Sequence, residues 1–315
     1  MVHSAPPRAE PRSTHPAFIP PAPEQPISGS KPTPPFTKPP KVRRRWPRYV
    51  VAGLLLYGAT AYGAWFWFSF VNPKDNISEE SGLIKQQKVN LSAVWDETAA
   101  RFDSDVELEE KTSCLWYLRN RLVRQASGHV LEVSVGTGRN FRYYNLDACK
   151  SLTFLDQSWP MLEVAKAKWR HLYPKSAYLD KSPENTKIAF KKQAAREITE
   201  KPVEGYDTII QTMGACSTPD PAETLSHLGT LLNQQTGRIL LIEHGRGYYN
   251  WINYILDRDA HRHAEKYGCY HNRDIGSIVK ESGLIIESIR RPIWWNLGTV
   301  WVIEARPQGW KNPAD

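Results

Sequence analysis

The chain has 315 residues and a formal net charge of +8, which is enough sequence for one or two domains with a sizeable hydrophobic core. The charge is unevenly placed, because residues 1–48 hold nine Lys or Arg against two Glu and leave the remainder almost neutral. This distribution excludes a strongly basic globular surface of the kind that binds nucleic acid. The same segment holds 14 of the 24 prolines and no long apolar run, which predicts a disordered tail.

Residues 49–71 carry no charged side chain and follow a basic run that ends at Arg48. A helix of this length would measure about 35 Å, so the segment predicts one membrane-spanning helix rather than a buried core helix. The positive-inside rule would then place the tail and the C-terminal part on opposite sides of the membrane. Residues 72–90 are polar and are expected to form a stalk, and sequons at Asn76 and Asn90 keep an endoplasmic-reticulum location open.

Two helical stretches are expected between the stalk and the first strand. Residues 90–102 have helical apolar spacing with Ser92 as a candidate cap, and a second stretch opens at Asp103 and runs through Val123. Trp95 and Phe102 would either cover a ligand cleft or simply pack in the core, and the sequence leaves both interpretations open.

A glycine turn follows the first predicted strand. The apolar residues from Val130 run into Gly136 and Gly138, and a helix-compatible segment follows. Glycines allow a sharp turn and the close approach of a ligand, and a helix N-terminus offers unpaired N–H groups. A second strand ends in Asp156, whose carboxylate can accept ribose hydroxyls. Together these features predict a nucleotide-type site, but the spacing differs from the G-x-G-x-x-G pattern of dinucleotide binding.

The turn resembles the first motif of class I S-adenosylmethionine-dependent methyltransferases, which reads acid-x-Gly-x-Gly-x-Gly. Ser134 stands where that motif usually has its first glycine. The resemblance implies S-adenosylmethionine as cofactor, held by residues of the turn and of the next strand ends. These are Glu132, Ser134, Gly136, Thr137, Gly138, Asn140, Asp156, Gln157 and Thr212.

The rest of the chain alternates predicted strands and helices. A short strand is expected near 177–179, ending at Asp180, followed by a polar insertion from Lys181 to Lys201. Further strands are predicted at 205–212, 237–243, 284–290 and 299–305. Seven strands ending in a hairpin-like pair predict a Rossmann-like methyltransferase sheet over residues 91–307, with a C-terminal tail at 308–315.

Three local patterns narrow the resemblance: the glycine turn, Cys216-Ser217 before a proline-bearing turn, and Glu243-His244 at the end of the fifth strand. They resemble the membrane-anchored methyltransferase-like proteins, most of all the fungal OMS family, over about residues 42–307. That resemblance implies a mitochondrial inner-membrane protein, and the positive-inside rule would then place its catalytic domain in the intermembrane space. It also implies two competing functions: a methyltransferase, or an assembly factor for respiratory-chain components with little or no catalysis.

Methyl transfer chiefly requires the acceptor, methyl group and sulfur to be held in line, with a general base only if the acceptor must lose a proton. His244 is the candidate base, although a core histidine is an open alternative. His261 and His263 fall in a highly charged predicted helix and are interpreted as solvated, while Tyr270 and His271 could line the acceptor pocket.

The cysteines form no C-x-x-C pair, so buried free thiols are favoured over a metal or redox motif. They are Cys114, Cys149, Cys216 and Cys269. Aromatic residues are abundant in the last third of the chain, where they could form an apolar acceptor pocket, face a membrane or fill the core. They are Trp251, Tyr254, Trp294, Trp295 and Trp301. A lipophilic small acceptor is compatible with a domain held near a bilayer.

Overall fold

The computed structural model describes residues 48–66, 90–174 and 187–311. The predicted tail up to residue 47, the stalk up to residue 89 and the strand expected near 177–179 lie outside these residues, as does Asp180. Helix α1 (Arg48–Phe66) belongs to a unit separate from the one that contains all the strands.

The structure does not support the membrane-spanning helix predicted at 49–71. In the segments that are described, no helix is both long and apolar enough to cross a bilayer. Helix α1 has 19 residues, which rise about 28 Å. Residues 67–71 lie outside the described part. The intermembrane-space location of the catalytic domain was predicted from that span and stays a prediction.

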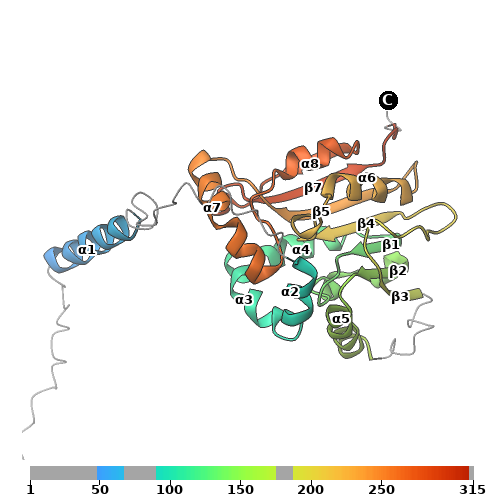
Figure 1. Ribbon diagram of the computed structural model, residues 1–315, viewed down its shortest axis with the longest axis horizontal. Coiled ribbons are helices and arrows are strands. Elements are labelled where there is room, and N and C mark those ends of the chain that lie inside the picture. Colours follow the sequence, from blue (N-terminus) through green and yellow to red (C-terminus); the bar gives the residue numbers. More distant parts are fainter. Residues whose placement is uncertain (1–47, 67–89, 175–186, 312–315) are drawn as a thin grey trace, which may run out of the picture. The chain divides into compact units, whose positions relative to one another are not determined.

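The remaining described residues are built on a seven-stranded sheet in the order β3-β2-β1-β4-β5-β7-β6 (Figure 1). Strands β1 to β5 pair in parallel, and β7 runs antiparallel between β5 and β6. The strands are β1 (Gly128–Val133), β2 (Cys149–Asp156), β3 (Lys187–Lys192), β4 (Thr208–Thr212), β5 (Arg238–His244), β6 (Ile285–Arg290) and β7 (Val300–Arg306). This confirms the predicted α/β sheet and its antiparallel end.

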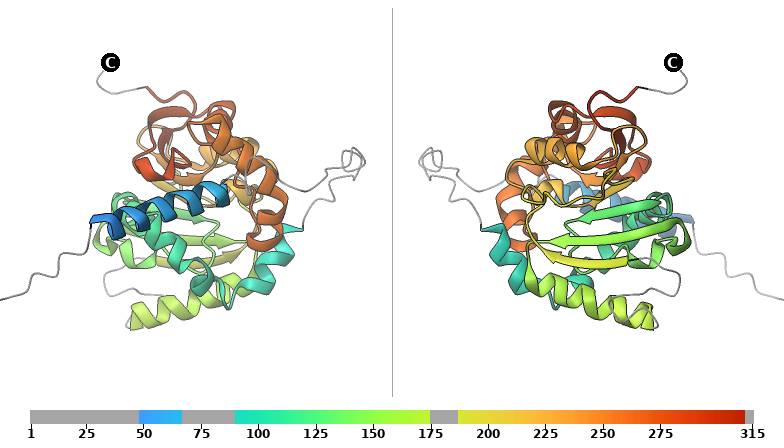
Figure 2. Two further views of the ribbon diagram at one scale, coloured as in Figure 1. Left: turned by 90° about the vertical axis from the view of Figure 1, so that its left-hand side faces the viewer. Right: turned by 90° about the vertical axis from the view of Figure 1, so that its right-hand side faces the viewer.

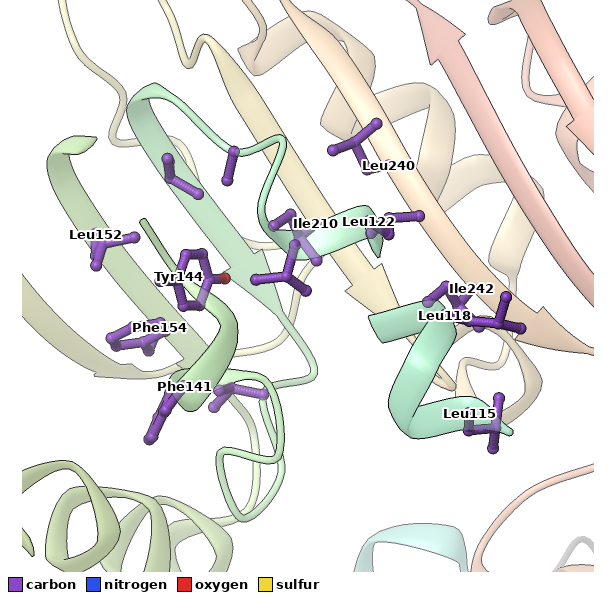
Figure 3. Packing of buried hydrophobic residues seen from close by; sticks show 14 of the residues in the cluster. Leu115, Leu118, Leu122, Phe141, Tyr144, Leu152, Phe154, Ile210, Leu240 and Ile242 are labelled. Atoms are coloured by element: carbon purple, nitrogen blue, oxygen red, sulfur yellow. The ribbon is translucent and has the colours of Figure 1, made fainter. Parts of the chain in front are cut away.

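The central strands are apolar on both faces because helices cover both sides of the sheet. Alternate residues, such as Val130 and Leu131, contribute to two separate hydrophobic clusters. One cluster is completed by α4 (Leu115–Val123) and α5 (Trp159–Leu172), the other by α6 (Pro221–Leu231) and α8 (Ile275–Glu281). Figure 3 shows Leu118 of α4 beside Ile242 in the first cluster, and Figure 2 shows α5 running alongside the β2–β3 end of the sheet.

Three further helices gather at one end of the domain: α2 (Leu91–Thr98), α3 (Phe102–Thr112) and α7 (Asn250–Tyr267) (Figure 1). Helix α2 packs against α5 and α7, and the Ser158 hydroxyl donates to Asp96 at 2.6 Å. Asn90 caps α2 instead of the expected Ser92, because its side chain accepts from the Ala93 N–H. The single helical stretch expected from Asp103 is broken at Cys114, which has a left-handed φ of 57°.

Strand β3 lies within the segment interpreted as a polar insertion, so that interpretation was wrong. Lysines at both ends gave it a solvated character, but Ile188 and Phe190 pack against the core. An edge strand needs only one apolar face, which makes its pattern weak. Short 3-10 helices complete the fold: η3 (Phe141–Tyr143), η4 (Leu146–Ala148), η6 (Ala215–Ser217) and η7 (Trp294–Asn296).

Candidate active site

The glycine turn after β1 has the left-handed conformations that its sequence predicts. Gly136 and Gly138 have φ of 53° and 77°, and Ser134 has φ of 54°. A non-glycine residue pays about 1–2 kcal/mol for this conformation, so the serine keeps the turn at a modest cost. A Cβ on Gly138 would lie 2.1 Å from the Phe141 ring, whereas one on Gly136 would meet no atom within 4 Å. The missing side chain of Gly138 therefore makes room for the Phe141 ring, and that of Gly136 leaves room for a ligand.

The prediction of a helix directly after the turn was wrong. The chain continues through turns into η3, three residues long, because Phe141 and Tyr144 are drawn into the core below. Figure 3 shows both rings packed beside Phe154 of β2.

Asp156 closes the turn from the neighbouring strand. Its Oδ2 accepts the Gly136 N–H at 2.7 Å and its Oδ1 accepts the Ser158 N–H at 2.9 Å. Burial raises the pKa of this carboxyl above its usual value. Each carboxylate oxygen of Asp156 keeps a lone pair that can accept a hydrogen bond from a ligand. The next residue, Gln157, is exposed.

Glu132 lies behind the turn and holds it in place. Its two oxygens accept from Asn140 Nδ2 at 2.9 Å and from the Tyr144 hydroxyl at 2.6 Å. Asn140 Nδ2 also donates to Thr212 Oγ1 at 3.0 Å, which ties the turn to the end of β4. Burial raises the pKa of Glu132 to about 7.

Substituting Glu132 by Gln is expected to flatten the pH dependence of stability. An acid whose pKa rises on folding favours the folded state when protonated, so its contribution is full below about pH 4.5 and is lost as the pH rises to about 7. The loss is at most about 1.4 kcal/mol per pH unit in this window. Denaturant unfolding of both proteins from pH 4.5 to 8 measures the difference. Parallel profiles would show that Glu132 has no raised pKa.

Arg119 of α4 joins this network, and no sequence pattern pointed to it. Its Nη1 donates to Asn140 Oδ1 at 2.9 Å and to Thr212 Oγ1 at 2.6 Å. Its Nη2 pairs with Glu110 Oε1 at 3.0 Å, and the other oxygen of Glu110 pairs with Arg139 at 2.5 Å. Arg119 is 6% exposed, so a buried cation links α3, α4, the turn and β4.

A cavity of about 390 Å³ lies at the carboxyl ends of the strands. It brings together most of the predicted site residues: Ser134, Gly136, Thr137, Asp156, Gln157, Thr212 and His244. It does not bring in Glu132, Gly138 or Asn140, which support the turn from behind. Sequence reasoning missed several other lining residues, among them Arg119, Gln193, Cys216, Tyr267 and Cys269. Trp95 and Phe102 also line it, so helices α2 and α3 cover the cavity.

A group of sulfur and imidazole side chains lines the same cavity. Cys216 lies in η6, His244 ends β5 and Cys269 follows α7, and their ligand atoms all lie within 4.8 Å of one another. His263 lies beside them, with Nδ1 3.5 Å from Cys269 Sγ, so its interpretation as a solvated residue was wrong. Burial alone would lower the pKa of His244, but the neighbouring Cys216 sulfur raises it to about 9.

The five aromatic residues singled out in the last third of the chain do not line the pocket. Four of them are exposed, namely Trp251, Tyr254, Trp294 and Trp295. Trp301 is buried, and the Arg291 guanidinium lies 3.4 Å from its ring centroid. Neither these residues nor Tyr270 and His271 are among the residues that line the described cavity. As expected, the four cysteines form no disulfide, with three buried and Cys114 half-buried.

Comparison with known proteins decides the family. A sequence profile described as "Methyltransferase domain" matches residues 108–289, more than half of the chain. The chain belongs to the methyltransferase domain family. S-adenosylmethionine is therefore the cofactor to consider for this cavity.

A curated relative is the mitochondrial methyltransferase OMS1 of Saccharomyces cerevisiae. It is 38% identical over 219 residues, which make up 68% of this chain and 46% of the relative. The chain thus spans about half the length of the curated relative that it matches.

Solved structures with similar folds share little sequence with the chain. A putative methyltransferase of Haloferax volcanii in complex with the Trm112 activator has 13% identity and a TM-score of 0.48, covering 68% of this chain and 98% of its own. A possible histamine N-methyltransferase of Thermotoga maritima has 15% identity and a TM-score of 0.47, covering 69% and 100%.

Proposed function

We propose that the chain is an S-adenosylmethionine-dependent methyltransferase that acts on a small acceptor. The observation that carries the proposal is one cavity with Asp156 and Gly136 in one wall and the imidazole of His244 in another. An enzyme of this type works by holding the acceptor atom, methyl carbon and sulfur in line, with reacting atoms about 3–3.5 Å apart. A scaffold would need neither the open space above Gly136 nor a buried carboxylate facing it.

The residues fit the cofactor in distinct ways. The Asp156 carboxylate would accept hydrogen bonds from the ribose hydroxyls, and the Gln157 amide would donate hydrogen bonds to them. The backbone from Ser134 to Thr137 would lie along one edge of the cofactor. Thr212 and the backbone behind it would hold the amino-acid end near the buried Arg119. Glu132, Gly138 and Asn140 would act indirectly, by keeping the turn in shape.

The acceptor is proposed to be small and partly apolar. Helices α2 and α3 contribute apolar side chains to the cavity wall, including Trp95, Phe102 and Val106. Because its pKa is raised to about 9, His244 would take the proton that the acceptor loses only in its neutral form, so methyl transfer would rise with pH toward 9. Its Nε2 lies 3.3 Å from Cys269 Sγ.

A mitochondrial location is proposed from the name of the yeast relative. The alternative function named in the sequence analysis is that of an assembly factor for respiratory-chain components with little or no catalysis. The substitution of serine for glycine at position 134 does not favour this alternative, because Ser134 adopts the same left-handed conformation that a glycine would. Fractionation of cells that produce the tagged full-length chain tests the location, and recovery outside mitochondria would refute it.

Substituting His244 by Asn is expected to lower methyl transfer about 100-fold or more while leaving cofactor binding nearly unchanged. The full-length chain is incubated with methyl-labelled S-adenosylmethionine and a small-molecule extract of mitochondria, and labelled products are counted. Calorimetry measures cofactor binding in parallel. Absence of cofactor binding by the folded wild-type chain would refute the enzyme, and equal labelling by His244→Asn would refute only the base.

A further inference from the structure

Three side chains at the floor of the cavity have the identity and spacing of metal ligands. Cys269 Sγ lies 3.3 Å from His244 Nε2, and Cys216 Sγ completes a triangle in which no pair of ligand atoms exceeds 4.8 Å. A tetrahedral Zn²⁺, with bonds of about 2.3 Å to sulfur and about 2.0 Å to nitrogen, places its ligand atoms roughly 3.5–3.8 Å apart. Side-chain adjustments of about 1 Å or less would bring all three onto one ion.

The backbone around the three ligands is held by the rest of the fold. Glu243 Oε1 accepts the N–H groups of Gly214 and Ala215, each at 3.1 Å, which fixes the turn that leads into Cys216. The Tyr270 N–H donates to the Cys216 carbonyl at 3.0 Å, which joins the two cysteine segments directly. His244 ends a central strand. Such support by neighbouring hydrogen bonds is what orients ligands in metal sites.

The segment with Cys269 is positioned from the other side. Gly268 ends α7 with φ of 68°, and a Cβ there would lie 2.0 Å from the Trp95 indole nitrogen. The Cys269 carbonyl accepts from His263 Nδ1 at 3.0 Å. Cys269 is thus held between α2 and α7, with its sulfur toward the cavity.

We propose that Cys216, His244 and Cys269 bind one Zn²⁺-type cation whose fourth coordination position opens into the methyl-transfer cavity. Two thiolates and one neutral imidazole balance the charge of a divalent ion, so the filled site buries no net charge. Soft sulfur ligands favour zinc over magnesium or calcium. Three protein ligands with one open position is the arrangement of catalytic rather than structural zinc sites.

The role of the cation, but not its binding, rests on the proposed function. An acceptor heteroatom that enters the fourth position would lose its proton to solvent more readily, because the cation stabilises the resulting anion. Its lone pair then forms the bond to the methyl carbon, while the electrons of the breaking carbon–sulfur bond stay on the cofactor's sulfur. His244 would in that case be a ligand and not the base.

Metal analysis of the full-length chain tests the proposal. The protein is purified under reducing conditions, equilibrated with one equivalent of Zn²⁺, freed of loosely bound metal by gel filtration and measured by mass spectrometry. We expect about one zinc per chain, and a loss of at least tenfold in retained zinc for Cys216→Ser and for Cys269→Ser. Cys149→Ser is the matched control, because Cys149 is also a buried cysteine outside any disulfide but lies in β2.

Co²⁺ gives a second measurement that needs no variant. Bound by two thiolates and an imidazole in the wild-type chain, it should show the intense visible bands of a tetrahedral thiolate site. A folded wild-type chain that retains no zinc and gives only the weak spectrum of hydrated Co²⁺ would overturn the proposal. So would equal zinc retention by Cys216→Ser/Cys269→Ser. Calorimetry with S-adenosylmethionine on the same samples keeps this failure distinct from failure of the methyltransferase, because cofactor binding does not require the cation.

Discussion

Replacement of Asp156 by Ala is expected to weaken S-adenosylmethionine binding about 100-fold, which corresponds to about 2.7 kcal/mol. The carboxylate would accept the ribose hydroxyls, and hydrogen bonds to a charged group contribute about 1.5–3 kcal/mol each. It also accepts the N–H of Gly136, so its loss frees the turn that forms the cofactor wall. Isothermal calorimetry on the full-length chain measures the change.

The control for this prediction is Glu163→Ala, which removes an exposed acid from α5, the helix that follows Asp156. Asp156→Asn separates the two roles, because the amide oxygen can still accept one backbone N–H. Gly138→Asp is a poor control, since its Cβ would strike the core ring of Phe141 and disturb the fold. Unchanged affinity of a folded Asp156→Ala protein would place the cofactor elsewhere.

Arg119→Met is expected to lower the free energy of unfolding by about 3–5 kcal/mol, the range for breaking a buried ion pair. The substitution leaves the carboxylate of Glu110 with one partner fewer in a buried position. It also removes the donor shared by Asn140 and Thr212, so the turn and β4 lose a common anchor. Methionine keeps most of the apolar stem and limits the cavity left behind.

Denaturant unfolding of the full-length chain measures this effect, and Arg121→Met on the same helix provides the control. Arg121 is exposed and contacts Tyr117 of its own helix at 3.1 Å, so its loss should change stability by no more than about 0.5 kcal/mol. Equal effects of the two substitutions would mean that the buried network contributes nothing beyond an ordinary surface charge.

The sequence predicted the sheet because central parallel strands are buried on both faces and appear as short apolar runs. Val130 to Val133 and Ile239 to Ile242 are of this kind. Strand β3 was not predicted, because this edge strand has lysines at both ends and only two apolar positions that pack against the core. The membrane span was predicted from the absence of charge over residues 49–71, of which 67–71 lie outside the described residues. Among the described helices, none is long and apolar enough to cross a bilayer.

The sequence predicted those site residues that lie at the ends of strands. It did not predict those that are brought into the site only by the tertiary fold. Asp156, Thr212 and His244 end β2, β4 and β5, so the sheet itself brings them together. Arg119 looks like one of several charged residues on a polar helix, and only the tertiary fold shows that it is buried. Cys216 and Cys269 are far apart in the sequence, so a search for closely spaced cysteines could not pair them.

The short 3-10 turn that replaces a helix after Gly138 also bears on which nucleotides the cavity accepts. A long helix at this position would aim its unpaired N–H groups and the positive end of its dipole at the ligand, which favours phosphate. Three residues of η3 provide no such field. S-adenosylmethionine carries a positive sulfonium and no phosphate, so the missing helix removes a source of repulsion. The same absence disfavours phosphorylated nucleotides that share its adenosine.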